Sequence, residues 1–170
     1  MDLFDKVFGP SFKKSECESL IRQASARINI HRNKKINEIQ KMKDDIRKHL
    51  AGGSEQNAII WTENLLNVES FIICYDVMAI LIDQFKGRLA SIEKFGVQAD
   101  IEETLATIVY AAPKMEVEEL MKVREQIHGL KGKDWIKEVD EGKIPINGNV
   151  AANVDFIKRA MGESTLRMVQ

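Results

Sequence analysis

Apolar residues recur at intervals of three and four along most of the chain, with polar residues between them. This spacing places the apolar residues on one face of an α-helix, whereas a half-buried strand would alternate apolar and polar positions. The first such stretch predicts a helix over residues 11–50, with Ser11 as its N-cap and Gly52-Gly53 at its end. Its apolar face consists of Cys17, Ile21, Ala24, Ile28, Ile36, Ile39, Met42, Ile46 and Leu50.

A second long helix with the same spacing is predicted over residues 54–96. Because only two glycines connect the two helices, they must fold back on each other as an antiparallel hairpin. The sequence therefore predicts a single all-α domain over residues 1–170, built on this hairpin. Its other segments are an N-terminal lead (1–10), short helices interrupted by Pro113 (100–141), a loop (142–149) and a C-terminal helix (150–162).

The predicted C-terminal helix has its apolar positions at Val150, Val154, Ile157 and Met161. An isolated helix of this length is only marginally stable in water. We therefore expect it to dock on the body of the domain or on another molecule.

Basic residues recur at every seventh position of the first helix. They are Arg27, Lys34, Lys41 and Lys48. A helical wheel places them on the side opposite the apolar face, although the whole chain carries a formal net charge of only −1. One interpretation is a solvated face with ion pairs such as Lys34–Glu38 and Lys41–Asp45. The other is a surface for acidic partners, either anionic lipid or an acidic helix of a neighbouring subunit.

Two further cations, Arg32 and Lys35, lie on the apolar face itself. Buried cations need counter-ions. A hairpin that turns near Gly52 places position 32 opposite roughly position 72, so Glu69 and Asp76 are the expected partners in structural ion pairs.

Candidate catalytic groups are sparse in this sequence. Glu125 and His128 form one Glu-x-x-His motif, but di-iron centres use two such motifs, and Glu125 points away from the apolar face of its helix. There is no Gly-rich phosphate loop and no nucleophile elbow. We expect a binding module without cofactor or metal. A di-iron or other helical-bundle enzyme and a different curvature-sensing helical module remain as alternatives.

The stretch from Ile108 to Met115 reads Ile-Val-Tyr-Ala-Ala-Pro-Lys-Met. It resembles the Ala-Ala-Pro helix junction of the increased-sodium-tolerance-one family, ESCRT-III-like proteins that regulate the vacuolar-protein-sorting AAA ATPase in the multivesicular body pathway. The chain departs from the family pattern at Ile59 and Trp61, where basic residues are usual, and at Ala79–Ile82, where Glu-Leu-Tyr-Cys is frequent. Further matches are Phe12-Lys13, Cys17, Arg27-Ile28, Arg32-Asn33-Lys34-Lys35, Ile39, Met42, Ile46, Ala58, Ile60, Glu63, Glu118, Leu120 and Val123.

The resemblance implies an ESCRT-III fold, in which shorter helices pack beside a long hairpin and a terminal helix folds back onto it. It implies charged multivesicular body proteins as partners, the ATPase as a direct or indirect partner, self-assembly, and no nucleic acid. It implies a cytoplasmic location peripheral to endosomal membranes. Direct contact with anionic lipid stays one of the two interpretations of the basic residues. It also makes the basic side of the hairpin the candidate assembly face: Arg22, Arg27, Lys34, Lys41 and Lys48.

Overall fold

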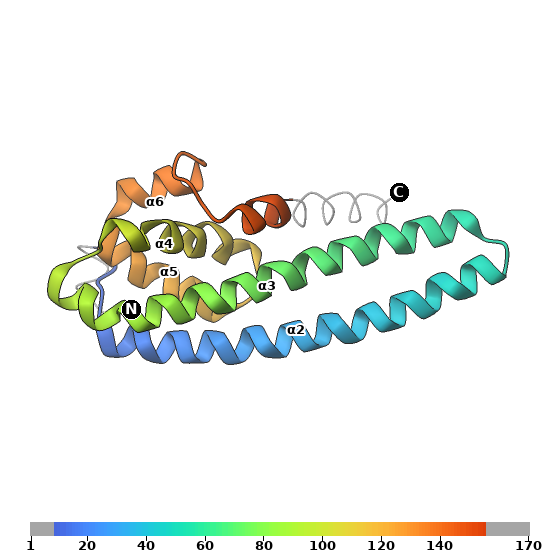
Figure 1. The fold of residues 1–170 in the computed structure, drawn as a ribbon, viewed down its shortest axis with the longest axis horizontal. Helices are drawn as coiled ribbons and strands as arrows, with labels where there is room; N and C mark the ends of the chain where they lie inside the picture. The colour runs from blue at the N-terminus through green and yellow to red at the C-terminus, as the bar shows by residue number, and fades with distance from the viewer. Residues whose placement is uncertain (1–8, 156–170) are drawn as a thin grey trace.

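The computed structural model describes residues 9–155, and within them every regular element is a helix (Figure 1). The elements are α2 (Lys14–Ala51), α3 (Glu55–Phe95), α4 (Ala99–Ala111), the 3-10 turn η1 (Ala112–Lys114), α5 (Glu118–Lys131) and α6 (Lys133–Asp140). Residues 148–155 are helical as well. The predicted all-α architecture is confirmed.

Helices α2 and α3 run antiparallel, side by side, over their whole length (Figure 1). The turn between them is short because Gly53 adopts a φ of +76°, a conformation that favours glycine. The predicted hairpin is therefore present, and it is the longest feature of the molecule.

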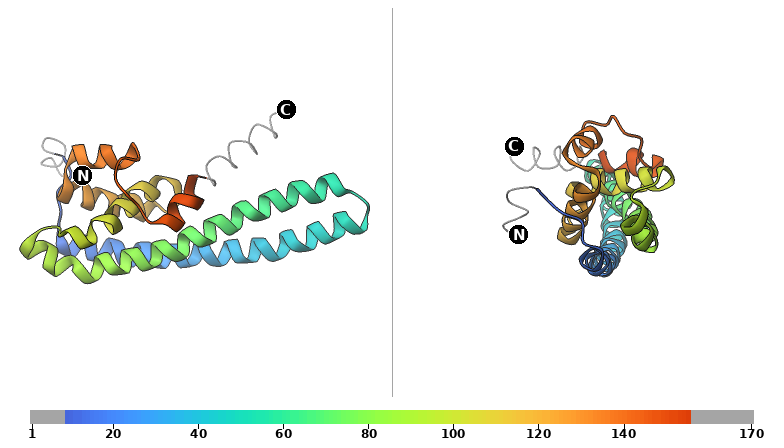
Figure 2. Two further views of the ribbon diagram at one scale, coloured as in Figure 1. Left: turned by 45° about the horizontal axis from the view of Figure 1, so that its top comes forward. Right: turned by 90° about the vertical axis from the view of Figure 1, so that its left-hand side faces the viewer.

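The shorter helices cover only one end of the hairpin (Figure 2). The core of that end includes Ile21, Ile28, Tyr75, Phe85 and Leu105, all of which are fully buried. Beyond them only the partner helix covers each long helix, so Ile39 is the one buried residue of α2 after Ile28, and Leu50 is 56% exposed. We call residues 32–69 the arm and the rest of the described chain the body.

A buried hydrogen bond ties the hairpin to the junction between α4 and α5. The hydroxyl of Tyr75 on α3 donates to the carbonyl oxygen of Met115, directly after η1, at 2.8 Å, and both residues are fully buried. Arg124 on α5 adds a second tie, because it donates to the Val109 carbonyl at 2.7 Å and to both carboxylate oxygens of Asp140 at 2.8 and 2.6 Å. These contacts fix α4, α5 and α6 relative to the hairpin.

The expected helix start at Ser11 is wrong, since α2 begins at Lys14 and has no side-chain cap. Residues 9–13, which we call the strap, instead cross α5. The crossing is so close that a Cβ on Gly129 would lie 2.5 Å from the backbone nitrogen of Phe12. The backbone N–H of Lys13 donates to Oε1 of Gln126 at 2.8 Å. Tertiary contact with α5, and not a local cap, therefore decides where α2 begins.

Candidate functional site

The basic residues predicted on α2 all lie exposed on its outer side. Two of them have partners: Arg22 pairs with Glu18 one turn away at 2.8 Å, and Arg27 reaches Glu119 on α5 at 3.0 Å. Arg27 therefore helps to hold α5 against α2 and is less available to an external partner.

The other three basic positions, Lys34, Lys41 and Lys48, follow one another along the arm. In the described part of the chain none of them takes part in an ion pair, so the expected Lys34–Glu38 and Lys41–Asp45 pairs are not formed. We call these three lysines the basic line. Three unpartnered cations at seven-residue spacing form a surface about 21 Å long, at about 1.5 Å of rise per residue.

Of the two cations on the apolar face, Arg32 forms the expected pair with Asp76 and Lys35 does not pair with either expected residue. Arg32 donates to Asp76 across the hairpin, but the side chains are 36% and 49% exposed, so the expected burial of this pair is wrong. Lys35 does not reach Glu69 or Asp76; its Nζ lies 3.9 Å from Glu38 and 4.7 Å from the ring centroid of Phe71. Among the described residues Glu69 forms no ion pair. The helices that would bury these groups end before the arm begins.

The C-terminal docking residues are only partly within the described chain. Val150 and Val154 are fully buried, whereas Ile157 and Met161 lie outside the described residues. The side-chain oxygen of Asn147 caps the helix, as it accepts from the backbone N–H groups of residues 149 and 150 at 2.9 and 3.3 Å. The docked start of this helix is therefore well defined.

The hydroxyl of Tyr110 on α4 donates to the carboxylate of Asp155, at 2.7 and 2.8 Å to its two oxygens. Burial, together with this hydrogen bond, raises the pKa of Tyr110 to about 12. The hydroxyl consequently remains a donor throughout the physiological pH range, and the last described helix is held to α4 by an ion–dipole contact in addition to its buried valines.

A row of exposed apolar residues runs along the outer side of α3, at seven-residue intervals. They are Ile59, Leu66, Ile73 and Ile80, between 41% and 60% exposed, and we call them the α3 stripe. Helix α3 is long and apolar enough to cross a membrane by length and composition, a test that a core helix also passes. The sequence interpretation assigned no role to this row. The signal was present at Ile59 and Ile80, which depart from the resembled family.

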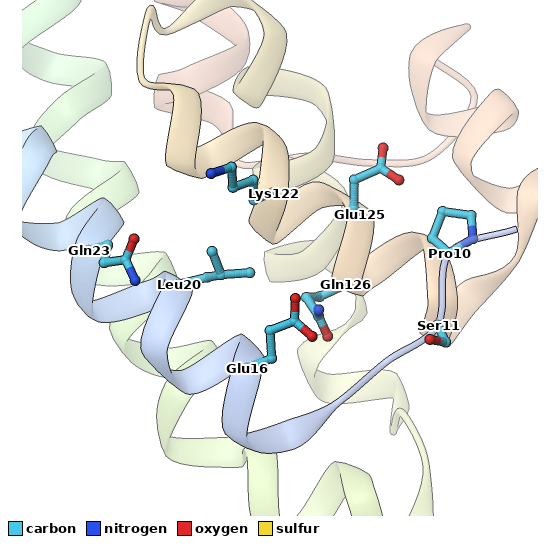
Figure 3. Close-up of a pocket in the computed structure, with 8 residues that line it drawn as sticks. All are labelled: Pro10, Ser11, Glu16, Leu20, Gln23, Lys122, Glu125 and Gln126. Atoms are coloured by element: carbon cyan, nitrogen blue, oxygen red, sulfur yellow. The ribbon is translucent and has the colours of Figure 1, made fainter. Parts of the chain in front are cut away.

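A pocket lies between the first turns of α2, helix α5 and the strap (Figure 3). Its volume is about 420 Å³. Figure 3 shows Leu20 and Glu16 projecting from α2 toward α5, with the strap closing one side. The lining residues are Pro10, Ser11, Glu16, Leu20, Gln23, Lys122, Glu125 and Gln126.

Metal-ligating and nucleophilic groups are dispersed in the described chain. Residues 9–155 contain no group of three or more His, Cys, Asp or Glu side chains that could hold a metal ion. Glu125 is exposed at the pocket rim. Burial raises the pKa values of the Cys17 and Cys74 thiols to about 12, so both are protonated at neutral pH.

Comparison with solved structures identifies the same arrangement elsewhere. The crystal structure of the N-terminal domain of Ist1 from S. cerevisiae, in complex with the Did2 MIM motif, superimposes with a TM-score of 0.75. The match covers 89% of this chain and 92% of that chain at 14% sequence identity, so it concerns the fold alone. The predicted ESCRT-III-like fold is confirmed.

Sequence comparison gives the relationship directly. An IST1-like protein from Dictyostelium discoideum is 26% identical over 134 residues, which are 78% of this chain but 36% of that protein, so the chain spans about a third of the length of this relative. The family model described as Ist1, "Regulator of Vps4 activity in the MVB pathway", matches residues 18–165. With most of its length matched, the chain belongs to the Ist1 family.

Proposed function

We propose that this chain is a non-catalytic adaptor that binds charged multivesicular body proteins and modulates recruitment of the Vps4 ATPase during endosomal sorting. It acts in the cytoplasm at endosomal membranes and assembles with further subunits. The observation that carries the proposal is the basic line, Lys34, Lys41 and Lys48, on a projecting arm of an Ist1-family fold. The yeast neighbour was solved with the Did2 MIM motif, which supports peptide recognition by this fold.

The basic line is the surface we assign to an acidic partner helix. Each exposed ion pair contributes about 0.2–1 kcal/mol. One such pair is too weak to hold a partner, so binding requires all three pairs at once. Only a partner helix whose acidic residues have the same spacing as the three lysines can form them, and this makes the interaction selective. Because the lysines are exposed, the interaction is strongly screened by salt.

The closed state of the domain rests on the C-terminal helix. Its first apolar residues, Val150 and Val154, are docked. The docked state that the structure describes therefore rests on these two valines and on the hydrogen bond between Tyr110 and Asp155. Undocking of this helix would expose the surface of the body that Val150 and Val154 cover. Hydrogen exchange tests this: the helix beginning at residue 148 should exchange faster than the body half of α3, and equal protection would contradict it.

The test of the proposed function measures binding of C-terminal peptides from charged multivesicular body proteins by isothermal titration calorimetry. The triple variant K34E/K41E/K48E should bind roughly tenfold more weakly, since three attractive pairs become repulsive. The matched control K43E/K94E/K133E makes the same charge change at exposed lysines on other faces and should bind normally. Equal losses in both variants would show a general charge effect and would refute the assignment.

Flotation with anionic liposomes separates protein partners from direct membrane contact. Each basic residue close to an anionic bilayer contributes about 1 kcal/mol. If K34E/K41E/K48E loses liposome binding while its peptide affinity is unchanged, the basic line faces lipid and the acidic-helix proposal fails.

A further inference from the structure

The strap supplies one wall of the pocket between α2 and α5. Pro10 and Ser11 form that wall, and the following residue, Phe12, packs against the hydrophobic core. Gly129 allows the close approach of the strap to α5, and the hydrogen bond from the Lys13 N–H to Gln126 holds the strap at that position. A volume of about 420 Å³ lies within the roughly 300–1,000 Å³ range of small-ligand sites.

Gln126 lines this pocket with an incomplete set of hydrogen bonds. The residue is 6% exposed, and its Oε1 is occupied by the Lys13 N–H. Its Nε2 has no acceptor among the residues that the structure describes. Among residues 9–155 the one fully buried side-chain polar atom without a hydrogen bond is Oδ1 of Asn67, so Nε2 of Gln126 is open to solvent on the pocket side. The pocket therefore presents a donor that a ligand oxygen would satisfy.

The charges around the pocket favour a cationic ligand group. Glu16 projects from α2 toward Gln126, and Glu125 lies at the rim on α5 (Figure 3). Within residues 9–155 neither carboxylate is engaged in an ion pair. Leu20 and Pro10 supply apolar surface beside them. Lys122 also lines the pocket, so Glu16, Glu125 and Lys122 together leave one net negative charge. A ligand that joins a cation to a neutral oxygen acceptor can satisfy both Glu16 and Gln126.

We propose that this pocket binds an arginine-bearing peptide segment. The guanidinium pairs with Glu16, with Glu125 at the rim, and a peptide carbonyl accepts from Nε2 of Gln126. The aliphatic part of the arginine packs on Leu20 and Pro10. Arginine fits better than lysine because its planar fork of donors matches a carboxylate in bidentate geometry. The site differs from the basic line in the sign of its charge, and it does not depend on the function proposed for that line.

The probe is the blocked tripeptide acetyl-Gly-Arg-Gly-amide, titrated into the ¹⁵N-labelled chain and followed by NMR. We expect saturable shifts at Glu16, Leu20 and Gln126, including the side-chain NH₂ of Gln126. The same tripeptide with citrulline in place of arginine keeps the shape without the charge, and it should bind about three- to fivefold more weakly.

The variant E16Q should weaken the arginine tripeptide by about three- to fivefold, whereas E18Q should leave its affinity unchanged. Glu18 is the matched control because it lies on the same turn of α2, is paired with Arg22 and does not line the pocket. Equal affinity for arginine and citrulline, no effect of E16Q, or the absence of saturable shifts at the pocket would each overturn the proposal. The lysine triple variant K34E/K41E/K48E should bind the tripeptide normally, so failure here is distinguishable from failure of the proposed function.

Discussion

Replacing Tyr75 with phenylalanine tests how the hairpin is tied to the α4–α5 junction. The substitution removes one oxygen and leaves the ring in place, so packing in the core is preserved. It also leaves the Met115 carbonyl without the donor that reaches it at 2.8 Å. Both residues are fully buried, and burial raises the pKa of Tyr75, so at neutral pH its hydroxyl is a protonated donor that water does not replace.

An unsatisfied buried carbonyl costs about 1–3 kcal/mol of unfolding free energy. For a chain of 170 residues each kcal/mol corresponds to roughly 2–4 °C, so Y75F should lower the Tm by about 2–12 °C. Urea denaturation followed by circular dichroism measures the free energy, and a thermal scan measures the Tm. The denaturant m-value should not change, because the exposed surface on unfolding is the same.

The matched control is Y110F, which removes a phenolic hydroxyl whose acceptor, Asp155, lies near the surface. Its loss should cost less than about 1 kcal/mol, since water can solvate the carboxylate. A Y75F variant that is as stable as the wild type to within about 0.5 kcal/mol would refute the reasoning, because Met115 would then have another donor.

Three other substitutions have defined outcomes. D76A should lower the unfolding free energy by only about 0.2–1 kcal/mol in urea titrations, because the Arg32–Asp76 pair is half-exposed; a loss above about 2 kcal/mol would show a buried pair. Arg124 lowers the pKa of Asp140 by hydrogen bonding, so this pair stabilises the fold above the ordinary aspartate pKa and its contribution is lost as pH falls through the lowered value; D140N should flatten the pH dependence of the urea midpoint below about pH 4. L105A should cost about 2–5 kcal/mol in the same assay, since Leu105 is fully buried, and a smaller loss would indicate collapse of the cavity.

The two long helices could be predicted because their apolar spacing is regular and only two glycines separate them. Cys17, Ile21, Ala24 and Ile28 were all expected on the apolar face, and all are buried. The prediction that these residues are buried needs only the local spacing of apolar residues, and that spacing can be read directly from the sequence.

The start of α2 could not be predicted, because it depends on a contact 113 residues away. Ser11 has the local chemistry of an N-cap, but the chain there is held by Gln126 and passes over Gly129. A glycine inside a helix indicates that another segment passes close to it, but the sequence around the glycine does not show which segment that is.

The extent to which residues along the hairpin are buried could not be predicted from the sequence either. The apolar face predicts Arg32 and Lys35 to be buried as firmly as the residues around Ile28, yet Arg32 remains 36% exposed. The reason is that burial depends on where α4 and α5 end along the hairpin, and helix length alone does not give their position. The exposure of the α3 stripe could not be predicted for the same reason, because the sequence shows that a residue is apolar but not whether another helix covers it.

The face of α2 that carries the basic line is not uniformly basic, because Glu16 lies close to it near the start of the helix and Arg27 on it is paired with Glu119. Glu16 and Leu20 of the pocket lie within about 60° of the same helix face as Lys34, Lys41 and Lys48. A rod-like ligand with its own separation of charge can therefore lie along this helix in one direction and not in the reverse one. Subunits added in this way would all point alike, so a chain of them would have two chemically different ends.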